Sequence, residues 1–180
     1  MLYCFLAPGF EETEAIAPID LLRRAGLDVR TVGVGAKTVV GSHHIPVVCD
    51  LTEDEIVLGD ALDGVILPGG MPGTLNLEKS AAVQSALDYC SANGKLLCAI
   101  CAAPSVLGHK GLLNGKRATA FPGFEDDLTG AAVSARSVVT DGNVITAKGA
   151  GVALDFGLAI VAALKDEATA KTIRAAIQCP

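Results

Sequence analysis

The residues from Lys95 to Gly108, KLLCAICAAPSVLG, contain a cysteine at a position suited to nucleophilic chemistry. An apolar run ends near Cys101, and two alanines and a proline follow at once. This order predicts a buried strand that turns sharply into a helix, and the small residues resemble a nucleophile elbow with cysteine in place of serine. A helix that begins at Ala102 would direct its backbone N–H groups at the sulfur, which favours the thiolate and lowers the pKa of Cys101.

Two other interpretations of Cys101 stay open. One is a redox pair with Cys98, but three steps along a strand cover about 10 Å, whereas the Cα atoms of a disulfide lie within about 7 Å. The other is an unreactive buried thiol, which is also our interpretation of Cys4, Cys49 and Cys98. The corner position alone supports a reactive and an inert Cys101 equally.

An acidic motif, GFEETEA, follows the first expected strand and lies at the same edge of the sheet as Cys101. Glu14 shares a helical stripe with Pro18 and Leu21, which points it inward, whereas Glu11 and Glu12 are expected to face solvent. A buried carboxyl group tends to stay protonated and can then donate a hydrogen bond to a thiolate. A plain first-turn residue that favours the helix dipole is the alternative interpretation of Glu14.

The motif LPGGMPG places two glycines directly after another expected strand. Backbone N–H groups at Gly69 and Gly70 could form an oxyanion hole for a carbonyl attacked by the cysteine, although a plain tight turn explains the same residues. The histidines offer no Cys–His dyad. His43 and His44 are expected in a solvated loop, and His109 lies about two turns into the helix that follows the cysteine.

The remaining pattern predicts one α/β domain over residues 1–180. Strands are expected at 2–7, 28–33, 64–67 and 95–100, and helices over 11–26, 80–92, 152–164 and 167–177, with a kink or a later start of the first helix at Pro18. Residues 32–50 indicate an excursion with a hairpin, and Asp141–Gly142 predicts a tight turn between β-branched runs. Alternating strands and helices predict a mostly parallel sheet that is covered on both faces.

Composition narrows the function classes. The chain has a net charge of −6 and 51% hydrophobic residues, and it has no cluster of Lys or Arg of the kind that binds nucleic acid. Its apolar stretches fall short of the roughly 20 residues that span a membrane. The first residues lack the positive region of a signal peptide, so we expect a cytoplasmic protein with six reduced cysteines. The cysteine spacing and the weak fragments GVGAKT and GAGVAL predict neither a metal site nor a cofactor.

Four motifs together, GFEETEA, LPGG, AICAAP and KGAGVALDFGLAIVAAL, resemble the ThiJ/PfpI superfamily, in particular its parkinsonism-associated deglycase group and bacterial relatives. The likeness runs from Leu2 to about Leu164. It implies a flavodoxin-like (class I glutamine amidotransferase-like) sandwich that forms homodimers, with Cys101 as the reactive residue and Glu14 hydrogen-bonded to its sulfur. The oxyanion pocket would be lined by backbone groups of Gly69, Gly70 and Ala102. The apolar residues Ile16, Ile19 and Leu22 suit the core more than the dimer interface.

Members of this family are described as cofactor-independent glyoxalases or deglycases that act on methylglyoxal-type dicarbonyls. They are also described as oxidative-stress sensors, whose cysteine oxidises to a sulfinate, and as chaperones. The resemblance therefore implies an enzyme that uses Cys101 and Glu14, which we favour, or a redox sensor or chaperone without physiological turnover. Phe121 stands where some members carry a histidine, and Ala102 stands where the peptidase branch has one. Both departures weaken a protease assignment and leave the proton-transfer group open.

Overall fold

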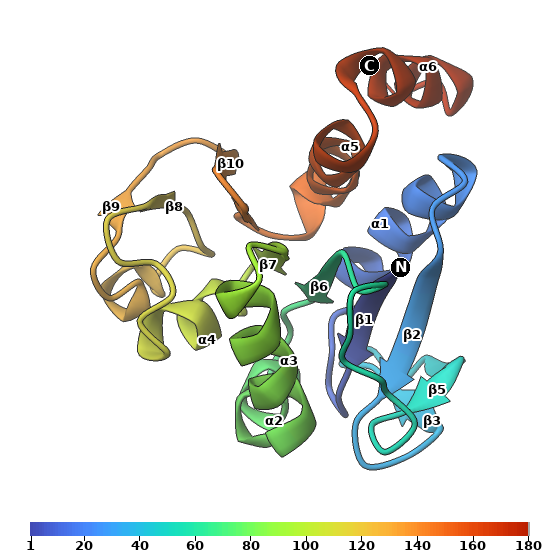
Figure 1. The fold of residues 1–180 in the computed structure, drawn as a ribbon, viewed down its shortest axis with the longest axis vertical. Helices are drawn as coiled ribbons and strands as arrows, with labels where there is room; N and C mark the ends of the chain where they lie inside the picture. The colour runs from blue at the N-terminus through green and yellow to red at the C-terminus, as the bar shows by residue number, and fades with distance from the viewer. Residues whose placement is uncertain (180) are drawn as a thin grey trace.

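A seven-stranded sheet forms the centre of the computed structural model, which describes residues 1–179 (Figure 1). Adjacent strands run parallel, except for an antiparallel pair at one edge. This arrangement confirms the expected flavodoxin-like α/β sandwich. In spatial order, the strands are β10 (Val138–Asp141), β11 (Val144–Ala147), β7 (Leu96–Ile100), β6 (Gly64–Leu67), β1 (Leu2–Leu6), β2 (Val29–Gly33) and β5 (Leu51–Thr52).

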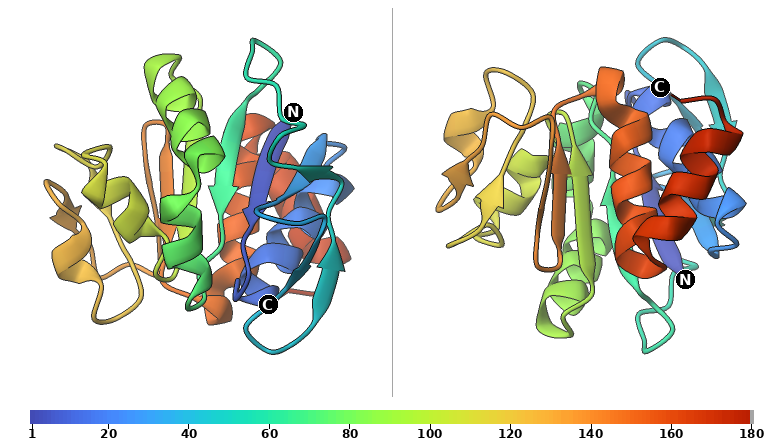
Figure 2. Two further views of the ribbon diagram at one scale, coloured as in Figure 1. Left: turned by 90° about the horizontal axis from the view of Figure 1, so that it is seen from below. Right: turned by 90° about the horizontal axis from the view of Figure 1, so that it is seen from above.

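Helices cover both faces of this sheet, as Figure 2 shows from two opposite sides. One face carries α1 (Glu12–Arg24), α5 (Ala153–Leu164) and α6 (Glu167–Ala176). The other face carries α2 (Gly73–Lys79), α3 (Ala81–Ala92) and α4 (Pro104–His109). Because β7, β6 and β1 are parallel neighbours, their carboxyl ends meet at one edge, which is where open α/β sheets bind ligands.

The side chains of β1 alternate between two apolar cores. Leu2, Cys4 and Leu6 pack with α1 and α5, whereas Tyr3 and Phe5 pack against the opposite layer. All five are buried. Both faces of the strand are therefore apolar, which is typical of a parallel sheet between two helix layers.

The shorter elements lie outside the main sheet. The expected excursion contains an antiparallel hairpin, β3 (Thr38–Val40) and β4 (Pro46–Val48), and the turn between β10 and β11 has Gly142 at φ 60°. Both hairpin predictions are confirmed. The remaining elements are β8 (Arg117–Ala118), β9 (Ala132–Val133) and the 3-10 helices η1 (Glu125–Asp127) and η2 (Ala150–Val152).

The first helix begins before its proline. α1 starts at Glu12, so the alternative of a start at Pro18 is wrong. The side chain of Glu11 accepts the backbone N–H of Glu14 at 2.7 Å and stabilises the first turn. Pro18 lies at the contact between α1 and α5. A Cβ built on Gly157 of α5 would be 2.9 Å from Cα of Pro18. Sequence reasoning also missed the short helix α2, because its Pro72 and glycines indicated only a turn.

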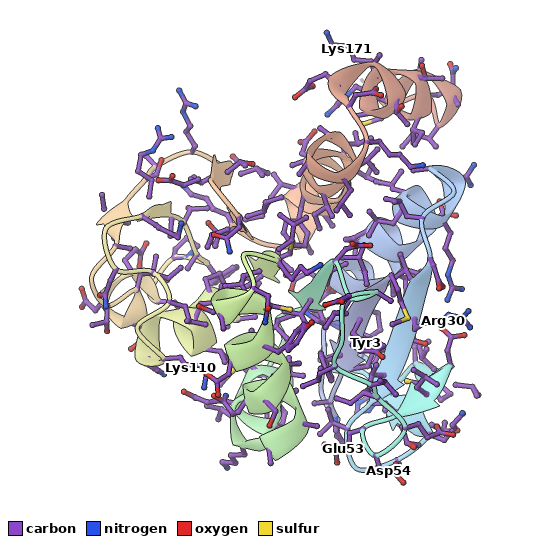
Figure 3. The ribbon with its side chains drawn as sticks, in the orientation of Figure 1. Tyr3, Arg30, Glu53, Asp54, Lys110 and Lys171 are labelled. Carbon is purple, nitrogen blue, oxygen red and sulfur yellow. The ribbon has the colours of Figure 1, made fainter. Side chains whose placement is uncertain are left out.

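Charged side chains are spread over the surface. Figure 3 places Arg30, Lys110 and Lys171 on separate parts of the molecule. Arg30 pairs with Asp28 and Lys110 pairs with Asp88, which reduces the local positive charge at both positions. Among residues 1–179, no helix has the length and apolar character that crossing a membrane requires.

Candidate active site

Cys101 lies at the corner between β7 and α4, as the sequence predicts. Its backbone has φ 65°, a left-handed conformation that is uncommon for a residue other than glycine. The backbone N–H of Cys101 donates to Ala147 at 2.9 Å, and its carbonyl accepts from Phe121 at 2.8 Å. These two bonds hold the strained corner between β11 and the loop after α4. The helix itself begins at Pro104, so the expected start at Ala102 is wrong by two residues.

Glu14 reaches the sulfur from the first turn of α1. Its side chain is 1% exposed and shares a hydrogen bond with the side chain of Cys101. Oε2 of Glu14 also accepts the backbone N–H of Gly69 at 2.9 Å. A Cβ built on Gly69 would lie 2.6 Å from Cβ of Cys101 and 2.7 Å from this oxygen, so only glycine permits the approach. The structure therefore confirms the inward direction of Glu14 and brings it to Cys101.

Burial raises the pKa of the Glu14 carboxyl to about 7. The hydrogen bonds with Cys101 and with the backbone of Gly69 and Ala150 favour the ionised form, but they do not offset burial and the charge of Glu11. Glu14 can therefore take up or release a proton near neutral pH, which is the property of a general acid–base group.

The expected lowering of the Cys101 pKa is wrong. Burial, followed by the charge of Glu14 and the hydrogen bond to it, raises this pKa to about 12. The backbone N–H groups of Gly70 and Ala102 act in the opposite direction, but more weakly. Two of the three raising causes come from the ionised Glu14 carboxylate, and both disappear when Glu14 holds the proton. Glu14 and Cys101 are thus a coupled pair in which the position of one proton decides the charge of the sulfur.

The three expected oxyanion residues have different partners. The N–H groups of Gly70 and Ala102 point at the sulfur, whereas the N–H of Gly69 donates to Glu14. Gly70 has φ 89°, and a Cβ there would lie 2.5 Å from the backbone N of Glu11. Gly70 and Ala102 are therefore the donors available to a negative charge that develops next to the sulfur.

The other cysteines are free thiols in different surroundings. Cys4 and Cys98 are buried in the core, and burial raises the pKa of both. Cys101 is partly exposed. This difference favours a reactive Cys101 over the two alternatives considered from the sequence, because Cys98 has the surroundings of an inert core thiol.

His43 and His109 both have acidic partners. His109 contacts Glu78 at 2.7 Å and Asp127 at 3.3 Å. Within the part of the chain that the structure describes, the side-chain partner of the sulfur is an acid rather than an imidazole.

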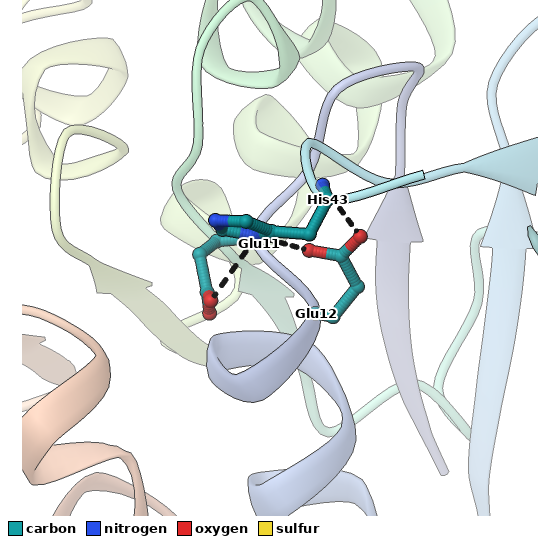
Figure 4. A group of neighbouring side chains, drawn as sticks. All are labelled: Glu11, Glu12 and His43. Carbon is teal, nitrogen blue, oxygen red and sulfur yellow. Dashed lines mark hydrogen bonds and ion pairs between the residues drawn. The ribbon is translucent and has the colours of Figure 1, made fainter. Parts of the chain in front are cut away.

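A cluster of Glu11, Glu12 and His43 was not expected from the sequence (Figure 4). Glu12 is 8% exposed, so the expectation that it faces solvent is wrong. Its carboxylate accepts the backbone N–H of His43 at 2.8 Å and contacts Nδ1 of the same residue at 2.9 Å. The three side chains are close enough to share a metal ion, but both oxygens of Glu12 already have these partners. The cluster therefore ties the β3–β4 hairpin to α1, a contact between distant segments that no local pattern indicates.

A cavity of about 350 Å³ adjoins the Cys101–Glu14 pair. Phe121, Lys148 and Gly149 are among its lining residues. A Cβ built on Gly149 would lie 3.3 Å from the Phe121 ring and 3.7 Å from Oε1 of Glu14, so this wall touches the site directly. The larger cavity of about 680 Å³ lies elsewhere, beside Glu53 and Asp54, which are labelled in Figure 3. We consider the smaller cavity the candidate substrate pocket because two of its lining residues, Gly149 and Ala150, also lie next to Glu14.

This arrangement suits addition of sulfur to a carbonyl. Glu14 can accept the thiol proton and later return it, and the N–H groups of Gly70 and Ala102 can stabilise the oxygen that becomes negative. Sequence reasoning identified each of these residues, but it did not assign a role in the site to Lys148, although this residue begins the motif KGAGVALDFGLAIVAAL.

Comparisons with known proteins agree with this geometry. The model of the DJ-1/PfpI family matches residues 2–163. The chain is 39% identical over 158 residues to Protein dj-1beta of Drosophila melanogaster, covering 86% of this chain and 84% of that protein. It is 33% identical over 145 residues to Deglycase PH1704 of Pyrococcus horikoshii, covering 79% of this chain and 86% of that protein. The solved structure of oxidized Toxoplasma gondii DJ-1 has a TM-score of 0.94 at 34% identity and covers 98% and 97% of the two chains.

Proposed function

Because the chain belongs to the DJ-1/PfpI family, we propose that it is a cysteine-dependent, cofactor-independent glyoxalase or deglycase acting on methylglyoxal-type dicarbonyls or their adducts. The observation that carries this proposal is the hydrogen-bonded pair of Cys101 and buried Glu14. A relative that covers most of the chain is named a deglycase, which supports the same reaction class.

The reaction begins with addition of the Cys101 sulfur to the aldehyde carbon of methylglyoxal. The thiol proton passes to Glu14, and the carbonyl oxygen takes the electron pair of its broken π bond. Hydrogen bonds from Gly70 and Ala102 stabilise this oxygen until Glu14 returns the proton and a hemithioacetal forms.

Glu14 is then a carboxylate again and can act as a base. It removes the proton from the former aldehyde carbon and delivers it to the neighbouring ketone carbon, while the hydroxyl proton on the former aldehyde oxygen passes to the ketone oxygen. The hemithioacetal thereby becomes a thioester of lactate. Water hydrolyses the thioester, which releases lactate and restores the Cys101 thiol. The net change is addition of one water molecule to methylglyoxal, and no external oxidant or reductant takes part.

The test is lactate formation from methylglyoxal by purified protein. We expect Cys101→Ser and Glu14→Gln each to lower kcat by at least about 100-fold, since each loses a group that acts in every turnover. Cys179→Ser changes a thiol in another part of the chain and serves as the control. Turnover close to that of the natural protein in either site variant would refute the proposal.

A redox sensor or chaperone without turnover is the second candidate. Cys101 is partly exposed, whereas Cys4 and Cys98 are buried, so an oxidant would reach it more readily than it reaches either core thiol. A sulfinate at Cys101 would accept hydrogen bonds from Gly70, Ala102 and protonated Glu14. The structural relative from Toxoplasma gondii is described as oxidized, which supports this candidate.

We also propose a homodimer in the cytoplasm, where a reducing environment keeps the six cysteines as thiols. Ile19 and Leu22 are buried as predicted, but Ile16 is 43% and Val48 is 72% exposed, and both line one groove between α1 and β4. This groove, in which Ile16 and Val48 lie beside the charged residues Asp20, Arg23 and Asp50, is our candidate interface.

Light scattering after size exclusion tests the dimer. Val48→Asp should produce monomers, because a carboxylate in an apolar interface loses its hydration. Val57→Asp is the matched control, since Val57 is equally exposed but does not line this groove. An unchanged mass for Val48→Asp would place the interface elsewhere.

A further inference from the structure

We propose that the substrate of this site carries an anionic group, which binds the ammonium of Lys148 in the cavity beside Phe121. The inference rests on the proposed function and adds a substrate class to it. The substrate would be a dicarbonyl whose reactive aldehyde lies at Cys101 and whose carboxylate or phosphate lies at the far end of an apolar body.

The cavity shares a wall with the reacting pair. Phe121 donates its backbone N–H to the carbonyl of Cys101, and the wall at Gly149 touches both the Phe121 ring and Glu14. Ala150, which also lines the cavity, forms a backbone hydrogen bond with Glu14. The far end of a longer substrate held at the sulfur would therefore lie close to this space.

The cavity is larger than methylglyoxal requires. Its volume of about 350 Å³ lies in the range of small-molecule sites. The ring of Phe121 is 47% exposed and forms an apolar wall. A flat or apolar group can pack against this ring, so the site favours a substrate with more atoms than the dicarbonyl alone.

Lys148 supplies a positive charge that the protein does not use. The residue is half-buried and lines the cavity, and its backbone N–H donates to Ser137 at 2.9 Å, which fixes where the side chain begins. Over residues 1–179, its ammonium has neither an ion pair nor a hydrogen bond, whereas Lys110 pairs with Asp88 at 2.8 Å. The ammonium lies at the end of a half-buried side chain that lines the cavity, and an anionic ligand there would give it a partner.

The experiment compares two aldehydes that differ by one charge, phenylglyoxal and para-carboxyphenylglyoxal. We expect the natural protein to prefer the carboxylated aldehyde, measured as the ratio of the two kcat/KM values. Lys148→Met should lower this ratio about tenfold, mainly through KM for the charged aldehyde, as loss of a charge-assisted hydrogen bond predicts. Lys148→Arg should keep the preference, and Lys165→Met, a lysine outside the cavity, should leave the ratio unchanged.

The outcomes separate this inference from the proposed function. Turnover of both aldehydes with a kcat/KM ratio that Lys148→Met does not change overturns the inference and leaves the proposed function standing.

If neither aldehyde is turned over, the proposed function fails, and binding of the unreactive analogues para-acetylbenzoate and acetophenone decides the inference. The inference is supported if the natural protein binds the charged analogue more tightly, and if Lys148→Met abolishes this preference while Lys148→Arg retains it. Equal binding of the two analogues overturns the inference. Thermal unfolding shows which variants are folded, and Lys148→Gln replaces Lys148→Met if that variant is not.

Discussion

One proton shared by Glu14 and Cys101 decides whether the sulfur can act as a nucleophile. The carboxyl has its pKa raised to about 7 by burial, and the thiol has its pKa raised to about 12 by burial and by the ionised carboxylate. Neither residue titrates alone, because each charge changes the other. In the proposed mechanism the form with one proton on Glu14 and a negative sulfur is the reactive one, and the backbone N–H groups of Gly70 and Ala102 favour it.

The pH dependence of alkylation reports on this pair. We expect the rate at which iodoacetamide modifies Cys101 to rise as pH passes through about 7, where the pair loses its first proton. In Glu14→Gln the side chain accepts no proton, so the midpoint should move upward by at least about one pH unit. Mass spectrometry of the Cys101 peptide measures the rate. An identical midpoint in the two proteins would contradict the coupling.

The pH dependence of the free energy of unfolding should include a contribution from the Glu14 carboxyl. The unfolded chain loses the Glu14 proton near pH 4.5, whereas the folded protein keeps it to about pH 7. The folded state therefore binds more protons in this window, so the contribution of Glu14 to the free energy of unfolding falls as pH rises. The raised pKa corresponds to a loss of about 3 kcal/mol.

The Glu14→Gln variant should not lose this stability as pH rises, because an amide does not ionise. Urea unfolding of both proteins at about pH 4.5 and about pH 8 isolates the effect, since their other titrating groups are the same. The variant should gain stability relative to the natural protein at the higher pH. A difference that does not change with pH would contradict the raised pKa.

At the scale of elements, the contact between α1 and α5 positions Glu14. Alanine is normally better than glycine inside a helix by about 1 kcal/mol. At Gly157 of α5, however, a Cβ would lie 2.9 Å from Cα of Pro18 and 2.8 Å from Cδ1 of Leu21. The leucine side chain can rotate, but the backbone of Pro18 moves only with α1.

Gly157→Ala should therefore destabilise the protein, by about 1–3 kcal/mol as for other overpacked sites. Denaturant unfolding measures the change. Gly151→Ala is the control, because a Cβ at Gly151 has no neighbouring atom within 4 Å. The free energy of unfolding of this variant should be almost unchanged. A stabilised Gly157→Ala variant would show that the two helices separate without cost.

At the scale of the whole molecule, the fold distributes six thiols over different depths. Cys4 and Cys98 lie in the core, and Cys49 and Cys90 are also buried. Cys101 and Cys179 are partly exposed, and Cys101 lies at the edge where strands end. The sheet thus separates a partly exposed thiol next to an acid from four that are shielded. That the whole chain forms one domain remains a prediction.

Selective oxidation tests this distribution. Mild hydrogen peroxide should add two oxygens to Cys101 before the four buried thiols change, with two peroxide molecules reduced to water for each sulfinate. Peptide mass spectrometry locates the oxygens, and Glu14→Gln should slow the reaction. Oxidation spread evenly over the six cysteines would contradict a higher reactivity of Cys101 and would argue against the redox-sensor candidate.

Local patterns in the sequence determined the order of most strands and helices, both hairpins and the corner at Cys101. Periodicity and turn residues act over a few positions, so they can be read from a single chain. The inward direction of Glu14 also followed from its helical stripe. The short helix α2 was missed because its local residues favoured a turn.

Only the tertiary structure decided the charge of the sulfur. The helix dipole at Cys101 is local and suggested a lowered pKa, but burial and Glu14, which lies far away in the chain, raise it. The tie between Glu12 and His43 and the placement of Lys148 beside Phe121 depend in the same way on segments that meet only after folding. Electrostatic energies depend on distance and solvent exposure, and both are properties of the folded chain.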